Sequence, residues 1–324
     1  MKKKEFIGID VSKEKIDVFI LSKGQHSCVG NNEAAFKGML KWFKELGIAT
    51  KSIAICFEHT GYYSEALALF LASKKITFFM VSSINIKYSM GLQRGKSDKL
   101  DAKRIGEYIS KHFDKLQPTV LQSDAVSELK KLLSLRNQLE KTKTAMQNRL
   151  KNSKKPGFIK SIEETLLNTV TQQIKQVDQE IKKLIQSDAK LNEIDCLLQS
   201  IKGLGPVSSW YLMAYTNAFD YFSNARKFAC YCGIAPFEHQ SGSSVKRKSK
   251  TDRRSNRKVN GILTMAANSA AMYNPELKEY FIRKTNEGKS YHTVINAIKN
   301  KLVTRAFAIV ARKTPYVDLK KYAA

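Results

Sequence analysis

Residues 5–21, EFIGIDVSKEKIDVFIL, decide the fold of the first part of this chain. The apolar run that ends at Asp10 predicts one β-strand, and residues 15–21, which alternate in their first half, predict a second strand after the turn region 11–14. A short continuous apolar run at residues 52–57 is typical of a central strand covered on both faces. The chain therefore begins with a β-sheet whose middle is buried.

The elements that follow complete an α/β domain. Further strands are expected at residues 26–29 and 76–81, and helical spacing of apolar residues predicts three helices, at residues 33–46, 62–73 and 100–113. Strands followed by strand–helix–strand–helix indicate a mixed sheet with helices packed on it. We therefore expect an N-terminal α/β domain over residues 1–120.

Residues 121–190 have the pattern of long helices. A loose apolar seam at Leu132, Leu135 and Leu139 is separated by Pro156-Gly157 from a cleaner one. That second seam is a heptad pattern made by Leu167, Val170, Ile174, Val177, Ile181 and Leu184. Such a helical coiled-coil insert forms either an antiparallel hairpin, a dimerising coiled coil or an ordinary pair of bundle helices.

Residues 191–324 are expected to form a second, mostly α-helical domain. It contains the turn Lys202-Gly203-Leu204-Gly205, which precedes a predicted helix at residues 207–216. An apolar–Gly–apolar–Gly turn between helices resembles the helix-hairpin-helix motif, in which glycines let backbone N–H groups approach a DNA phosphate. The ordinary alternative is a Gly-Pro turn with no ligand.

The charge of the chain favours a polyanionic partner. Lys and Arg number 56 against 29 Asp and Glu, so the formal net charge is +27. A chain this basic is expected to bind nucleic acid or an anionic membrane surface. Because no apolar stretch approaches the roughly 20 residues that span a bilayer, and the basic start runs into a strand, we expect no membrane association and a cytoplasmic protein that binds nucleic acid.

The five cysteines are scattered and suggest neither a metal site nor disulfides. Cys230 and Cys232 are close together, but no second Cys or His pair lies at the spacing of a zinc site. Disulfides are not expected in a cytosolic protein.

Four acids stand out in this basic chain: Asp10 and Glu58 at the ends of predicted strands, and Asp98 and Asp101 at i and i+3 of a predicted helix. Parallel neighbouring strands bring their carboxyl ends to one edge, so the four could face one point. Such a group of carboxylates would bind Mg²⁺ for phosphoryl transfer, as in the RNase H-like fold that this arrangement resembles. Each acid could instead cap a turn or helix, or pair with a cation.

A serine beside glycine, Ser241, is followed by a dense basic run. The run is expected to bind nucleic-acid phosphates and comprises Lys246, Arg247, Lys248, Lys250, Arg253, Arg254, Arg257 and Lys258. In this setting Ser241 is either part of a flexible polar loop or a nucleophile that attacks a DNA phosphate. The residues alone do not decide between the two.

Several motifs together resemble the DEDD insertion-sequence transposases, a superfamily that includes the pilin-gene invertases. They occur in the order of the family and cover nearly the whole chain: IGIDVSK (7–13), FEHTGYY (57–63), KSDKLDA (96–102), LQSIKGLG (198–205), GIAP (233–236) and HQSG (239–242). The resemblance is specific because two unrelated domains match with a helical spacer between them.

This resemblance implies a serine-dependent DNA recombinase. Asp10, Glu58, Asp98 and Asp101 would bind Mg²⁺, and Ser241 would form the covalent link to DNA. Family members often have a double serine, so Ser243 and Ser244 are the alternatives to Ser241. The family further implies donor and target DNA as substrates, a structured bridge RNA as guide, and a homodimer or homotetramer in which the acids of one protomer meet the serine of another.

Two other functions fit parts of the pattern. A metal-dependent nuclease or junction resolvase would use the four acids with water as the nucleophile. A nucleic-acid-binding module with decayed chemistry would use only the basic surface, but the four acids and Ser241 are all present.

Overall fold

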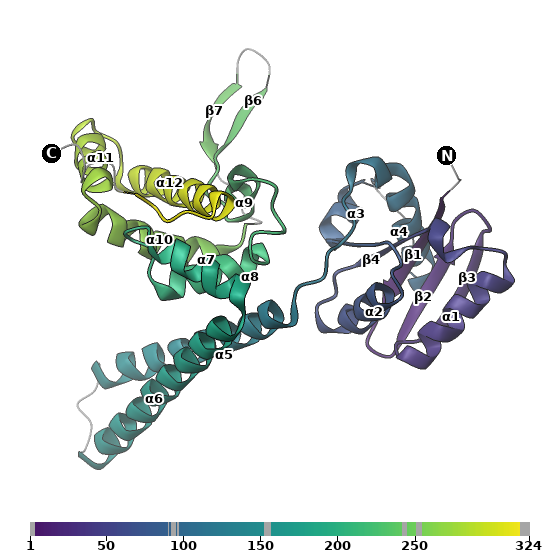
Figure 1. The fold of residues 1–324 in the computed structure, drawn as a ribbon, viewed down its shortest axis with the longest axis horizontal. Coiled ribbons are helices and arrows are strands. Elements are labelled where there is room, and N and C mark those ends of the chain that lie inside the picture. The colour runs from purple at the N-terminus through teal and green to yellow at the C-terminus, as the bar shows by residue number, and fades with distance from the viewer. Residues whose placement is uncertain are drawn as a thin grey trace. The chain divides into compact units, whose positions relative to one another are not determined.

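A computed structural model describes residues 4–89, 91, 95, 97–151, 157–241, 245–250 and 255–317, with the backbone alone for residues 237–241 and 245–250. The chain forms two compact units, Met1–Leu121 and Gln122–Ala324. Each unit has its own hydrophobic core, and Figure 1 shows the helices and strands of each.

The first unit is built on the mixed sheet that the sequence predicts. Its five strands lie in the order β3-β2-β1-β4-β5. β1 pairs antiparallel with β2 and parallel with β4, while β2–β3 is antiparallel and β4–β5 parallel. The strands are β1 (Glu5–Val11), β2 (Lys15–Ile20), β3 (Gln25–Gly30), β4 (Ile53–Glu58) and β5 (Phe78–Val81). This topology is compatible with an RNase H-like domain.

Helices cover both faces of this sheet. Helices α1 (Glu33–Glu45) and α2 (Tyr62–Ser73) bury their apolar sides against the face of β1 that carries Ile7 and Ile9. Helix α4 (Asp98–His112) covers the opposite face, where Ile105 and Ile109 pack on Cys56 of β4. The short helix α3 (Ser83–Ser89) and the 3-10 turns Thr50–Ser52 and Phe113–Lys115 were not predicted from the sequence.

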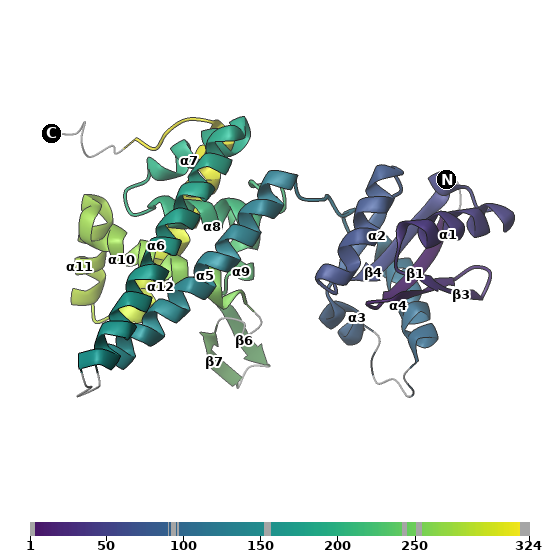
Figure 2. The ribbon, with the colours of Figure 1, turned by 90° about the horizontal axis from the view of Figure 1, so that it is seen from below.

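The second unit begins with two long helices, α5 (Asp124–Lys151) and α6 (Gly157–Ser187), which pack side by side (Figure 2). The heptad pattern of α6 is buried within the chain at Val170, Ile174, Val177 and Ile181. On α5 the predicted seam is partly wrong, because Leu135 is exposed. The fully buried residues there are Val126, Leu129 and Leu133, and Leu132 and Leu139 of the predicted seam pack partly buried against the same core.

The rest of this unit is mostly helical, as expected. Its helices are α7 (Ala189–Gln199), α8 (Pro206–Thr216), α9 (Ala225–Tyr231), α10 (Arg257–Tyr273), α11 (Pro275–Asn286) and α12 (Tyr291–Arg312). Between α9 and α10 the chain forms an antiparallel hairpin of β6 (Phe237–Ser241) and β7 (Val245–Lys250). The hairpin lies where the sequence predicted a polar loop followed by a basic run. None of the helices described is long and apolar enough to cross a membrane.

Candidate active site

Asp10 and Glu58 lie at the same edge of the sheet in the first unit. β1 and β4 are parallel neighbours in which Ile9 pairs with Phe57, so the next residues along each strand are Asp10 and Glu58. Both side chains belong to the face of the sheet that α4 covers, because alternate strand residues share a face and Gly8, two residues before Asp10, packs on α4.

Helix α4 brings the other two acids to this edge. A Cβ built on Gly8 would overlap the carbonyl oxygen of Ala102 and the amide nitrogen of Gly106, so strand and helix meet backbone to backbone. The helix begins at Asp98, and Ser97 is its N-cap because the Ser97 hydroxyl accepts a hydrogen bond from an amide in the first turn. The capping role that was the alternative reading of Asp98 therefore belongs to Ser97.

Asp10 and Glu58 each feel the charges of neighbouring carboxylates, including acids of α4. Burial raises the pKa of Asp10, and the negative charges of Asp101, Asp98 and Asp17 raise it further. Burial also raises the pKa of Glu58, with added repulsion from Asp10 and Asp101. The carboxylates of two strands and one helix thus converge on the same region of the first unit.

Asp98 and Asp101, the two acids in the first turn of α4, each form a salt bridge with a basic side chain. Lys15 Nζ donates a hydrogen bond of 2.7 Å to Asp98 Oδ2. Arg104 Nη1 donates one of 2.7 Å to Asp101 Oδ1, while its Nη2 donates to the carbonyl oxygen of Gly95 at 3.0 Å. These contacts fix the orientation of both carboxylates.

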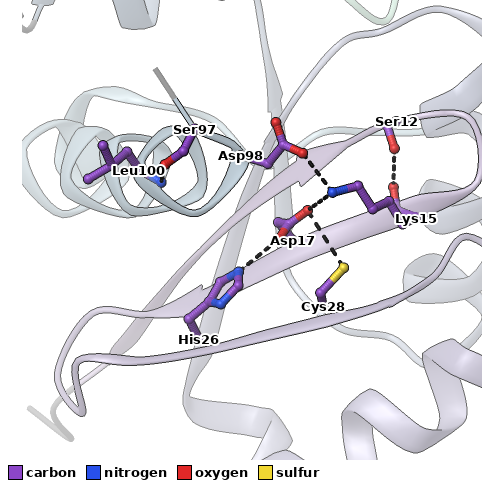
Figure 3. A network of polar contacts seen from close by, with 8 residues as sticks. All are labelled: Ser12, Lys15, Asp17, His26, Cys28, Ser97, Asp98 and Leu100. Carbon is purple, nitrogen blue, oxygen red and sulfur yellow. Dashed lines mark hydrogen bonds and ion pairs between the residues drawn. The ribbon is translucent and has the colours of Figure 1, made fainter. Parts of the chain in front are cut away.

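Sequence reasoning missed a fifth acid on the same face, Asp17 of β2. It pairs with Asp10 across the β1–β2 ladder and is only 5% exposed. Its carboxylate contacts His26 Nε2 at 2.8 Å, Lys15 Nζ at 3.4 Å and the Cys28 thiol at 3.8 Å (Figure 3). Its place beside Asp10 depends on the register of β1 and β2, which the alternation of residues 15–21 alone does not fix.

The chemistry of these acids fits a hard divalent cation. Every ligand atom in the set is a carboxylate oxygen, the type that Mg²⁺ prefers. Burial, and after it the repulsion between neighbouring carboxylates, raises the pKa of Asp10 and Glu58, and a bound cation would offset both effects. Among the residues described, no three His, Cys, Asp or Glu side chains are grouped so closely that they could hold a metal as they stand.

Ser241 lies in the second unit, as the last residue of β6. Its backbone pairs with Val245, the first residue of β7. Ser243, Ser244, Arg253 and Arg254 lie outside the described residues. Four more predicted phosphate contacts, Lys246, Arg247, Lys248 and Lys250, are all on β7.

Residues 232–234, which lead into this hairpin and form its root, are held by side chains from two helices. Asn260 of α10 donates to the carbonyl oxygens of Cys232 and Gly233, at 2.7 and 3.2 Å, and Asn296 of α12 donates to that of Ile234 at 2.7 Å. Lys299, whose pKa is lowered by burial, donates to Asn260 Oδ1 at 3.0 Å.

The two chain ends of the hairpin segment also meet. Asn256, the N-cap of α10, donates its backbone N–H to the Tyr231 carbonyl at 2.9 Å and its side-chain amide to the Tyr231 hydroxyl at 2.8 Å.

The turn with Lys202, Gly203 and Gly205 joins α7 to α8. Gly203 has φ +108°, and an added Cβ there would lie 2.8 Å from Ala270 Cα, so this glycine is required by packing on α10. Gly205 is the N-cap of α8, and a Cβ there would meet nothing within 4 Å. Lys202 is exposed.

The last two predicted phosphate contacts lie at the start of α10. Arg257 is exposed, whereas Lys258 is half-buried, with Nζ 5.0 Å from the centre of the Tyr211 ring. Burial, together with the nearby charge of Lys141, lowers the pKa of Lys258.

Two family models match successive parts of the chain, and the first extends past the first unit to the end of α5. Residues 7–153 match the IS110-type DEDD model, described as "Transposase", and residues 195–281 match the model "Transposase IS116/IS110/IS902 family". The first match contains all four acids, and the second contains Ser241 and the glycine turn. These matches support a transposase or recombinase of the IS110 type that acts on DNA.

Individual proteins are similar to this chain along nearly all or part of its length. The pilin gene-inverting proteins of Moraxella bovis and Moraxella lacunata are each 27% identical to it over 320 residues, which is 97% of this chain and 98% of theirs. An uncharacterized 44.8 kDa protein of insertion element IS116 from Streptomyces clavuligerus is 23% identical over 117 residues, 36% of this chain and 29% of that protein.

Proposed function

We propose that this chain, which carries both domains of an IS110-type transposase, cuts and rejoins DNA strands through a covalent serine–DNA intermediate assisted by Mg²⁺. The observation that carries the proposal is the convergence of Asp10, Glu58, Asp98 and Asp101 at one sheet edge in a chain of net charge +27. Carboxylates gathered in so basic a chain are best explained by a metal that neutralises them against a phosphate.

The proposed reaction is a transesterification at phosphorus. As the Ser241 Oγ–P bond forms, the P–O bond to the leaving deoxyribose oxygen breaks; the serine loses its proton and the leaving oxygen gains one. Attack on the phosphoserine by a new deoxyribose hydroxyl reverses these changes and joins the strands. One bond is exchanged for another of the same kind, so rejoining needs no ATP.

The first unit would contribute the four acids to this reaction. When bound, Mg²⁺ supplies positive charge for the scissile phosphate and the leaving oxygen. Asp10 and Glu58 would hold it from the strand ends, and Asp98 and Asp101 from α4, with Lys15 and Arg104 fixing the orientation of the helix acids.

The proposed partners are donor and target DNA, a bridge RNA and further copies of this chain. The net positive charge and the basic strand β7 support nucleic-acid binding. Guidance by RNA pairing, and a homodimer or homotetramer in which the acids and Ser241 come from different protomers, are supported by the family resemblance.

A trapping experiment tests the chemistry. Purified protein is incubated with its RNA, labelled donor DNA and Mg²⁺, then denatured and examined for label that migrates with the protein. We expect an adduct with wild type, Ser243→Ala and Ser244→Ala, and none with Ser241→Ala or Asp10→Asn. Free nicked DNA without any adduct would instead indicate a nuclease or junction resolvase that uses water.

A further inference from the structure

Lys15 starts from a rigid point in the first unit. Its carbonyl oxygen accepts two hydrogen bonds from Ser12, one from the backbone N–H at 3.0 Å and one from the hydroxyl at 2.7 Å. These bonds close the turn between β1 and β2, so the backbone that carries the lysine side chain is fixed relative to Asp10 at the end of β1.

The tip of the same side chain lies between two carboxylates. Lys15 Nζ is 2.7 Å from Asp98 Oδ2 and 3.4 Å from Asp17 Oδ2. Asp17 is buried and is held on its other side by His26, at 2.8 Å. Figure 3 shows the resulting chain of contacts, which runs from β3 through β2 to the first residue of α4.

This arrangement links the sheet to an acid of the helix. Asp98 is the first residue of α4, and its side chain is 51% exposed, so packing alone does not fix its direction. The buried Asp17 anchors the ammonium group, and the ammonium group in turn holds Asp98 on the side of the sheet where Asp10 lies.

We propose that Lys15, anchored by Asp17 and His26, is a positioning residue that holds Asp98 in place to bind a divalent cation. This inference rests on the proposed function, in which Asp98 is a metal ligand. Residues that orient metal ligands typically change metal affinity by about 10- to 100-fold when they are removed.

The opposite effect is expected if Lys15 acts only through its charge. A cation among carboxylates repels an incoming metal ion, so its removal would strengthen metal binding. The sign of the change in affinity therefore distinguishes positioning from competition.

The experiment measures binding of Mn²⁺ alone to the full chain, without nucleic acid, by electron paramagnetic resonance of the free ion. Mn²⁺ replaces Mg²⁺ at oxygen sites and gives a direct signal. We expect Lys15→Met to weaken Mn²⁺ binding about 10- to 100-fold. Asp17→Asn should also weaken Mn²⁺ binding. Lys15→Arg should bind more tightly than Lys15→Met, because arginine keeps the positive charge and the hydrogen-bond donors.

Lys13→Met is the matched control, since it removes one positive charge from an exposed position of the same turn. It should leave binding unchanged or slightly stronger. Lys15→Met that binds Mn²⁺ as well as or better than wild type, while circular dichroism shows it folded, would overturn the positioning role.

Asp98→Asn separates this inference from the proposed function. If Asp98→Asn leaves Mn²⁺ affinity unchanged, Asp98 is not a metal ligand and the proposed site itself is wrong. If Asp98→Asn weakens binding but Lys15→Met does not, the site stands and only the role of Lys15 fails.

Discussion

Gly8 of β1 and Gly106 of α4 lie backbone against backbone. A Cβ added to Gly106 would be 3.3 Å from the amide nitrogen of Gly8, and one added to Gly8 would overlap the backbone of α4. This close approach sets the height of the helix above the sheet, and with it the position of the two acids in the first turn of α4 relative to Asp10.

Gly8→Ala should therefore damage both stability and the site. The added methyl group must displace α4, and overpacking of this kind costs about 1–3 kcal/mol. Chemical denaturation would measure the loss, and Mn²⁺ affinity should fall with it. Gly38→Ala is the control: Gly38 is exposed in α1 with nothing within 4 Å of an added Cβ, so this change should stabilise the protein by up to about 1 kcal/mol.

The contribution of Asp10 to the stability of the metal-free protein should decrease as pH rises through the acidic range. Burial and neighbouring carboxylates raise the pKa of Asp10 above its unfolded value of about 4. The folded state then retains a proton that the unfolded state has lost, so stability is greatest below the unfolded pKa and is lost as pH rises through the folded pKa.

Asp10→Asn removes this pH-dependent contribution to stability. In EDTA at neutral pH, the variant should unfold at a higher temperature than wild type, although it should lack recombination activity, and added Mg²⁺ should stabilise wild type more than the variant. Asp114→Asn, at an exposed acid of the same unit, is the control and should not raise the unfolding temperature in EDTA at neutral pH. If Asp10→Asn is less stable than wild type at neutral pH, the burial of the Asp10 charge and its repulsion by neighbouring carboxylates are already compensated in the folded protein.

The Asn260 side chain should be a main support of the hairpin root. Asn260→Leu would leave two carbonyl oxygens and the buried Lys299 without this partner, a loss of about 1–3 kcal/mol. Because replacing both members of a buried polar pair by apolar groups can be nearly neutral, Lys299→Met should recover part of the loss in the double variant. A double-mutant cycle from urea unfolding would measure the coupling, and strictly additive effects would contradict it.

The two glycines of the α7–α8 turn should behave differently. Gly203→Ala places a side chain at φ +108° against Ala270 and should cost at least about 1–2 kcal/mol. Gly205→Ala should cost less than about 1 kcal/mol, but should weaken binding to duplex DNA, measured by fluorescence anisotropy, if the turn contacts a phosphate. Equal stability of the two variants would contradict the packing role of Gly203.

The sequence predicted most elements because their apolar periodicity is strong. The run before Asp10 and the heptads of α6 lie in buried strands and helices, where one period dominates. Strands β6 and β7 were not predicted, because a polar, basic hairpin has no apolar face whose alternation would reveal its strands. Helix α11 was missed although Asn274-Pro275 is an N-cap followed by a first-turn proline.

The candidate site was predicted only in part. Asp10 and Glu58 could be chosen because acids at the ends of apolar runs are conspicuous. Asp17 and Lys15 could not be distinguished from the polar residues that alternate in any half-exposed strand. Their importance comes from the register that pairs Asp17 with Asp10 and from the packing that brings Asp98 to Lys15. Both arise only in the tertiary structure.

The double hydrogen bond between Tyr231 and Asn256 has an evolutionary consequence. It returns the chain to the point where it left the helical scaffold, so the hairpin at residues 237–250 is an excursion whose ends are already joined. The entropic cost of closing such a loop grows only with the logarithm of its length. Insertions and deletions in the hairpin therefore cost the scaffold little, and the segment that carries Ser241 can diversify while α9 and α10 keep their places.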